Sequence, residues 1–359
     1  MKKHYLISAF QTAPQSAAGV FIPLMAFAFG ATAFEIGIIT MLSYVSRFIS
    51  EFYFGRMSDM VGRRRVFVKV GLLVSSLAFL LHTLMYDVMT IIAVRMILGF
   101  TLGRFYYPLV AQVSSHERFG KKLGRFSSYG SLGWVGGLVM AAVLVEYNTI
   151  FLMGAVLMFV AFLFSVLLPD ARESKIKIPL FPRDIIRKNK SLYLSVIARH
   201  IGAHSVWVVF PIYLMQNGLD KTGIALLLAV NPIVQIFFTQ IVGHMSEKKS
   251  ETIFIKASFL VSATAFLMFL LFTNPTLLAL GMGVIGISWS FLWIGSLINL
   301  SHKNSERSTA TGLLGSALGI SAVIGPIIGG VLATVFGYEA TFVFAVVCSL
   351  AAFAMSLRI

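Results

Sequence analysis

The sequence predicts an all-α membrane protein with twelve transmembrane helices in two pseudo-symmetric six-helix bundles. Three observations support this fold class: an apolar composition, twelve long apolar runs, and a repeat that relates the two halves. Of the 359 residues, 58% are hydrophobic and 12% are charged, whereas a soluble domain is roughly 45–50% apolar and about 25% charged. One soluble core could not bury so much apolar surface, which excludes a soluble enzyme, a disordered protein and a coiled-coil rod.

Each expected helix is a mainly apolar run of about 20 residues, the length that crosses the hydrocarbon core. In chain order the runs are 5–29, 35–57, 66–86, 88–112, 123–146, 149–168, 192–216, 222–245, 252–273, 275–301, 308–335 and 338–358. The first run has no small-residue cleavage site, so we interpret it as a retained helix and not as a signal peptide.

The segment 169–191 is the one long polar stretch, with three prolines and many charges. It predicts three parts: an N-terminal six-helix bundle (1–168), a cytoplasmic linker (169–191) and a C-terminal six-helix bundle (192–359). The linker itself is either a short surface helix or an extended connection.

Basic residues are concentrated in alternate loops. The chain has 29 Lys and Arg against 14 Asp and Glu, a net charge of +15, and the basic clusters follow the second, fourth and sixth runs. The loops on the other side contain Lys221 as their basic residue. By the positive-inside rule both termini are expected in the cytoplasm, and the excess charge needs no nucleic-acid partner. Short loops without targeting extensions favour a prokaryotic plasma membrane.

The two halves repeat with an offset of 188 residues. Pro23 and Pro211 share this offset, and so do Gly124 and Gly312. The segments 55–59 and 243–247, which close the second and eighth runs, also match at 188. Such internal repeats are typical of secondary transporters, in which two halves move around a site at the middle of the bilayer.

A glycine- and arginine-rich motif follows the second run. Its residues are Gly55, Asp59, Gly62, Arg63, Arg64 and Arg65. This loop resembles the signature loop of the major facilitator superfamily, with Met60 at a position that is usually basic in the family. The resemblance extends over the whole chain and implies that the loop is a conformational latch; the alternative is a helix stop with positive-inside charge. The family is mostly monomeric, so a monomer is expected.

Two further helices contain motifs of small residues. The fourth run has Arg95 followed by Gly99 and Gly103, which resembles a family motif whose arginine is linked to proton coupling; alternatively, Arg95 extends to the outer surface. The eleventh run has a packing motif of Gly325, Pro326, Gly329 and Gly330. In the family's antiporters a Gly-Pro motif lies in the fifth helix, and here that helix has the glycines without the proline.

Polar residues inside the apolar runs are the candidates for the transport site. The candidates for lining a substrate cavity are Gln15, Arg104, Trp289 and Trp293, and those for coupling are Glu51, Arg95 and His204. Glu51 is the carboxylate well inside a run, and Arg47 lies four residues before it on the same helical face. These candidates also have structural interpretations without a role in transport. Arg47 and Glu51 can simply neutralise each other, Trp289 and Trp293 can face lipid or pack in the protein, and His204 can be a buried core histidine.

These features favour a secondary active transporter that works by alternating access, with proton-coupled efflux of small amphipathic compounds as the leading hypothesis. The alternative is proton-coupled uptake of a small organic anion or sugar, because arginines outnumber carboxylates within the runs. An intramembrane enzyme is disfavoured because no cluster of catalytic residues stands out. The single cysteine, Cys348, can form no intrachain disulfide, and no motif indicates a metal or a cofactor.

Overall fold

A computed structural model describes residues 2–114, 119–144, 146–169, 182–245, 250–304 and 307–359. Within these residues the chain forms helices and short connections, with no strand. The helices before the linker are α1 (Lys2–Ala28), α2 (Ala33–Val61), α3 (Arg64–Leu81), η1 (His82–Leu84), α4 (Val88–Ser114), α5 (Phe119–Leu144) and α6 (Tyr147–Val166). Those that follow are α7 (Arg183–Lys188), α8 (Lys190–Trp207), α9 (Phe210–Gln216), α10 (Lys221–Met245), α11 (Glu251–Leu271), α12 (Pro275–Lys303), α13 (Arg307–Phe336) and α14 (Glu339–Ser356).

The helices confirm the predicted fold class and account for every predicted run. Eleven helical segments of the described chain are long and apolar enough to cross a membrane. The remaining predicted run, the first in the chain, is α1, which has 27 residues but is interrupted by more polar side chains. The seventh run is divided into α8 and α9, because Pro211 lies in the first turn of α9 and has no N–H to continue a helix.

Contacts divide the chain into two compact units. Unit 1 consists of Met1–Ala31, Leu42–Ile178 and Asp220–Leu226, and unit 2 of Thr32–Met41, Pro179–Leu219 and Leu227–Ile359. Each unit therefore includes the first turns of one helix from the other half of the sequence. The two exchanged segments begin 188 residues apart, at Thr32 and Asp220, so the exchange follows the internal repeat.

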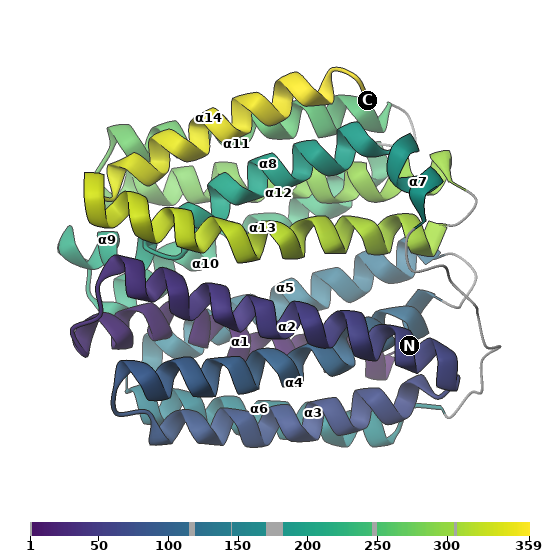
Figure 1. The fold of residues 1–359 in the computed structure, drawn as a ribbon, viewed down its shortest axis with the longest axis horizontal. Helices are drawn as coiled ribbons and strands as arrows, with labels where there is room; N and C mark the ends of the chain where they lie inside the picture. Colours follow the sequence, from purple (N-terminus) through teal and green to yellow (C-terminus); the bar gives the residue numbers. More distant parts are fainter. Residues whose placement is uncertain (1, 115–118, 145, 170–181, 246–249, 305–306) are drawn as a thin grey trace. The chain divides into compact units, whose positions relative to one another are not determined.

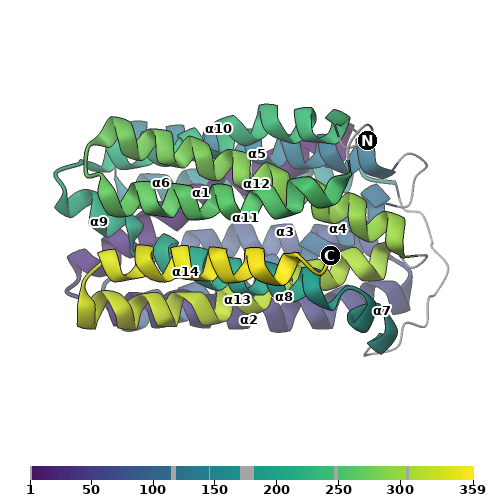
Figure 2. The same cartoon turned by 90° about the horizontal axis from the view of Figure 1, so that it is seen from above.

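The helices of unit 1 pack in four main pairs, which can be followed in Figure 1. α1 packs against α5 and α6, and α3 packs against α4 and α6. In unit 2, α8 packs against α13 and α14, and α11 packs against α12 and α14, as Figure 2 shows. These pairs correspond one to one under the sequence repeat. The two bundles thus share one architecture.

Equivalent helix crossings in the two units also have the same close backbone approach. A Cβ added to Gly137 of α5 would lie 1.9 Å from the carbonyl oxygen of Ala13 in α1. At the equivalent crossing in unit 2, a Cβ added to Gly325 of α13 would lie 2.8 Å from the carbonyl oxygen of Ile201 in α8. Small residues let the backbones approach this closely.

The predicted linker contains a short helix at its end. α7 covers Arg183–Lys188 and is followed by Asn189, whose side chain donates to the Ile185 carbonyl oxygen at 2.9 Å. Residues 170–181 lie outside the described chain. The later part of the linker is therefore a surface helix, one of the two forms that the sequence allowed.

Candidate functional site

The first group of buried polar side chains lies in unit 1, at the crossing of α1 and α2. We call Gln11, Gln15, Arg47 and Glu51 the α1–α2 polar cluster. Arg47 Nε lies 2.7 Å from Glu51 Oε1, and Arg47 NH1 donates to Gln15 Oε1 at 3.3 Å. Gln15 in turn donates to the Gln11 carbonyl oxygen at 2.9 Å. The structure thus confirms that Arg47 and Glu51 share one helical face.

Glu51 lies in the second half of α2, ten residues before the helix ends at Val61. The residues that follow it, Phe52, Tyr53 and Phe54, are aromatic, so the apolar run continues beyond Glu51. The Glu51 side chain is 14% exposed and that of Arg47 is 26% exposed, so the pair is largely but not fully shielded from solvent.

Arg95 of α4 lies close to this cluster. It is within electrostatic range of Tyr44 and Arg47, and the Ser43 hydroxyl donates to the Arg95 carbonyl oxygen at 3.1 Å. The Arg95 Nε atom is buried without a hydrogen-bond partner. The close approach of α2 and α4 depends on Gly99, where an added Cβ would lie 2.3 Å from the Ser43 carbonyl oxygen.

Arg104, the other arginine predicted on α4, has a different environment. Its guanidinium carbon lies 4.1 Å from the centre of the Phe54 ring. It also lines a pocket formed by α2, α3 and α4. The structure therefore groups Gln15, Glu51 and Arg95 around Arg47 and places Arg104 elsewhere in unit 1.

The second polar group lies in unit 2 and is organised by Arg199 of α8. Arg199 is 3% exposed, and its Nε donates to Ser262 Oγ at 2.8 Å. Ser262 Oγ lies 2.8 Å from Ser288 Oγ, which donates to the Ser258 carbonyl oxygen at 2.9 Å. One Arg199 nitrogen, NH2, is buried without a hydrogen-bond partner.

His200 is held in one neutral form by its two neighbours. Its Nδ1 lies 2.9 Å from the Val196 carbonyl oxygen, which only accepts a hydrogen bond. Its Nε2 lies 3.1 Å from Arg199 NH1, which only donates. The ring therefore carries its proton on Nδ1. A second proton on Nε2 would face a guanidinium, so His200 is poorly placed to take up a proton.

The predicted aromatic residues of α12 adjoin His200. The Trp289 and Trp293 rings stack with centres 5.5 Å apart and planes 11° apart, and the His200 ring meets Trp289 edge to face at 5.3 Å. The His204 ring lies 6.2 Å from that of His200. Unit 2 thus brings Trp289, Trp293 and His204 together around one imidazole.

The predicted packing motif of α13 lies against two helices of unit 2. Added Cβ atoms would lie 2.5 Å from His204 Cβ at Gly325 and 2.2 Å from the Ser205 carbonyl oxygen at Gly329. At Gly330 an added Cβ would lie 2.8 Å from the Ala33 carbonyl oxygen, and at Gly37 one would lie 2.6 Å from the Pro326 carbonyl oxygen. The motif therefore packs on α8 and on the first turns of α2.

The predicted latch is only partly described by the structure. Gly62 has φ +68°, a conformation that favours glycine, and it separates α2 from α3. Arg65 donates from NH2 to the Val166 carbonyl oxygen, while Arg63 is exposed and Arg64 half-buried. The Asp59 side chain and the surroundings of Gly55 lie outside the described residues. The latch therefore stays a prediction.

Two helical units of one architecture, each with charged or polar side chains inside apolar helices, are typical of an internally repeated membrane transporter. Within the described residues, no three His, Cys, Asp or Glu side chains are grouped so that they could hold a metal ion. The chain belongs to the Major Facilitator Superfamily, because the model of that family matches residues 5–197 and 192–359. The resemblance that the sequence motifs indicated is thereby confirmed.

The relatives of the chain include a protein named as a transporter and two named as resistance proteins. The chain is 23% identical over 358 residues to the uncharacterized MFS-type transporter MJ1560 of Methanocaldococcus jannaschii, covering 92% of this chain and 91% of the relative. It is 25% identical over 167 residues to the class H tetracycline resistance protein of Pasteurella multocida, covering 44% and 41%. It is 25% identical over 168 residues to the quinolone resistance protein NorA of Staphylococcus aureus, covering 46% and 43%. The chain thus spans less than half of each resistance protein.

Solved structures share the fold over nearly the full length. The nucleoside transporter NupG superimposes with a TM-score of 0.79 at 14% identity, covering 98% of both chains. A bacterial homolog of the human lysosomal transporter Spinster, in an inward-facing and unoccupied conformation, gives 0.80 at 13% identity and covers 99% of this chain and 95% of that one. Identities this low establish the fold alone.

Two serines of this group were not predicted from the sequence: Ser262, which accepts from Arg199, and Ser288, which bonds to Ser262. They are polar residues within apolar runs, and that is the only signal that could have drawn attention to them. Their role depends on α8, α11 and α12 meeting at one point, which no spacing along the chain indicates.

Proposed function

We propose that this chain is a proton-coupled exporter of small amphipathic compounds and that Glu51 carries the coupled proton. The observation that carries the proposal is the Arg47–Glu51 pair, 2.7 Å apart, within the apolar run of α2. Gln235 and Thr239 occupy the positions 188 residues later. Because the repeat folds into the same architecture without charges at these positions, the fold does not require the pair. Ionisable groups inside a membrane usually serve transport.

The geometry supports exchange of a proton against substrate. Protonation of Glu51 removes the negative charge beside Arg47 and leaves a guanidinium in a medium of low dielectric constant. Arg47 then interacts more strongly with Gln15, its other acceptor at 3.3 Å, and this shift would alter the contact between α1 and α2. Because the Glu51 side chain is 14% exposed, a proton has access to its carboxylate.

The direction of transport is supported by two further observations. Partial relatives include the tetracycline and quinolone resistance proteins, whose names indicate protection against small aromatic compounds. In unit 2, the stacked Trp289 and Trp293 rings provide an aromatic surface of the kind that binds planar apolar molecules. We further propose that the protein lies in the cell membrane with both termini in the cytoplasm, because its basic loops lie on that side.

A second candidate function is uptake of a small organic anion together with a proton. Arg199 supports it, since the residue is 3% exposed and one of its guanidinium nitrogens has no hydrogen-bond partner. A carboxylate or phosphate of a substrate would supply the missing acceptor and neutralise the charge. The nucleoside transporter fold is compatible with either direction.

The decisive experiment uses the purified full chain in liposomes that contain a pH dye. Gradients of lipophilic cations, sugars and organic anions are imposed in turn, and proton flux is recorded for the wild type, Glu51→Gln and Glu35→Gln. The control, Glu35, is a carboxylate at the exposed start of α2 that accepts from the Thr32 amide at 2.8 Å. Glutamine at position 51 retains an oxygen that accepts from Arg47, so the helix contact can persist while the titrating group is removed.

For the exporter, a cation gradient drives protons in the opposite direction in the wild type and in Glu35→Gln, and Glu51→Gln abolishes the proton flux. Proton movement with anions or sugars, in the same direction as the solute, would establish the uptake function instead. Opposite flux that persists in Glu51→Gln would retain export but reject Glu51 as the coupling residue.

A further inference from the structure

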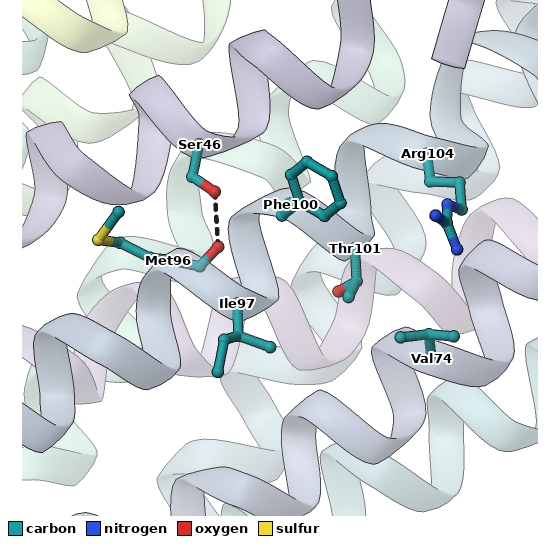
Figure 3. Close-up of a pocket in the computed structure, with 7 residues that line it drawn as sticks. All are labelled: Ser46, Val74, Met96, Ile97, Phe100, Thr101 and Arg104. Atoms are coloured by element: carbon teal, nitrogen blue, oxygen red, sulfur yellow. Dashed lines mark hydrogen bonds between the residues drawn. The ribbon is translucent and has the colours of Figure 1, made fainter. Parts of the chain in front are cut away.

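A pocket opens on the surface of unit 1 at a place that the proposed transport function does not use. It has a volume of about 440 Å³ and is lined by Ser46 of α2, Val74 of α3, and Met96, Ile97, Phe100, Thr101 and Arg104 of α4. Figure 3 shows Met96 at one end of the pocket and Arg104 at the other. The two residues are eight positions apart on α4, which corresponds to about 12 Å along the helix axis.

The lining is apolar and accessible from outside the unit. Met96, Ile97 and Phe100 are 37%, 45% and 40% exposed. The one hydroxyl shown bonded in Figure 3, that of Ser46, donates to the Met96 carbonyl oxygen at 2.7 Å and is thereby satisfied. On a helix that spans a membrane, such an exposed apolar surface faces the acyl chains of lipids.

Arg104 brings a positive charge to one end of this apolar pocket. Its guanidinium lies against the face of the Phe54 ring at 4.1 Å. Among the described residues, no carboxylate lies close enough to form an ion pair with it. α4 ends at Ser114, ten residues further on, which is about 15 Å along the axis. A charged side chain at this depth is costly without an anionic partner, and it can reach toward the headgroup region.

We propose that this pocket binds one acyl chain of an anionic phospholipid whose phosphate is held by Arg104. The chemistry of both ends fits this ligand. The guanidinium supplies paired N–H donors that match phosphate oxygens, and the apolar lining extends from it toward Met96. The phosphate then lies in the C-terminal half of α4 and the acyl chain extends toward its N-terminal half. A small free anion would leave the apolar lining unused.

The test measures lipid binding to the purified, delipidated full chain by native mass spectrometry. The probes are palmitoyl-oleoyl phosphatidylglycerol, the phosphatidylcholine with the same acyl chains, and glycerol 3-phosphate, which has a phosphate and no chains. The variants are Arg104→Gln, which removes the charge, and Ile97→Trp, which fills the pocket and keeps the charge. Arg125→Gln is the matched control, since Arg125 is an exposed arginine of α5 in the same unit. Thermal unfolding without lipid establishes that each variant is folded.

We expect the wild type to prefer phosphatidylglycerol over phosphatidylcholine, and Arg104→Gln to lose about tenfold in phosphatidylglycerol affinity, which corresponds to about 1.4 kcal/mol. Ile97→Trp should weaken binding of both lipids, and Arg125→Gln should bind as the wild type does. Equal phosphatidylglycerol binding by wild type and Arg104→Gln would overturn the proposal, as would glycerol 3-phosphate binding as tightly as the lipid. If Arg104→Gln does not fold, unchanged lipid binding by Ile97→Trp would overturn it.

Discussion

Gly136 and Gly137 are neighbours on α5 that should respond oppositely to the same substitution. A Cβ added to Gly137 would lie 1.9 Å from the Ala13 carbonyl oxygen and 2.2 Å from Ser16 Oγ, whereas one added to Gly136 would have nothing within 4 Å. Non-bonded heavy atoms prefer separations of about 3.5 Å or more. Gly137→Ala therefore requires α1 and α5 to separate by an amount on the order of 1 Å, while Gly136→Ala requires no movement.

The magnitude follows from the contacts that are lost. Overpacking of this kind costs about 1–3 kcal/mol, and displacement of Ser16 endangers its 2.9 Å hydrogen bond to the Trp134 carbonyl oxygen, worth about 0.6 kcal/mol in a membrane protein. The gain in helix propensity from Gly to Ala is at most about 1 kcal/mol and applies to both variants. We expect Gly137→Ala to be less stable than Gly136→Ala by about 2–4 kcal/mol.

The assay is equilibrium unfolding of the purified protein in mixed micelles with increasing SDS, followed by far-UV circular dichroism. Gly136→Ala should unfold at the wild-type SDS fraction or slightly above it, and Gly137→Ala clearly below it. Equal unfolding curves for the two variants would refute the close approach of α1 and α5 on which the reasoning depends.

Two further substitutions test other contacts. Ser262→Ala removes the acceptor of Arg199 Nε and should lower the free energy of unfolding by about 1–3 kcal/mol. The control Ser258→Ala, in the same helix and equally buried, should lower it much less. If SDS unfolding showed Ser258→Ala to be the less stable variant, the hydrogen bond between Arg199 and Ser262 would be contradicted. Asp87 accepts from the Thr90 amide at 2.7 Å, and this bond lowers the pKa of its carboxyl group. The stabilisation is therefore present at neutral pH and lost as the pH falls through the lowered pKa. The melting temperature of Asp87→Ala should be below that of the wild type at pH 7 and should converge with it in acid. A difference in melting temperature that does not change with pH would argue against stabilisation by the Asp87–Thr90 hydrogen bond.

The sequence predicted the helices well because each is defined by a local property, the length of an apolar run. It could not predict which face of each helix meets which neighbour, because helices that are apolar on all sides carry little periodic signal. Arg95 and Arg104 illustrate this limit: they lie on the same helix, yet Arg95 is near Arg47, whereas Arg104 contacts Phe54 and lines the outer pocket.

The residues around Arg199 could not be predicted for a related reason. Its partner Ser262 is 63 positions away along the chain, and the contact exists only once α8 and α11 have packed. By contrast, the Arg47–Glu51 and Trp289–Trp293 pairs could be anticipated, because residues four apart on one helix are neighbours whatever the helix packs against.

The hydroxyls of α1 have a consequence for how the protein enters the membrane. Ser8, Thr12 and Ser16 donate to carbonyl oxygens of residues 126, 130 and 134 in α5. During synthesis each acceptor emerges from the ribosome 118 residues after its donor. These three hydrogen bonds therefore form only after α5 has entered the membrane. A chain that ends before α5 leaves the three hydroxyls of α1 without their acceptors in α5.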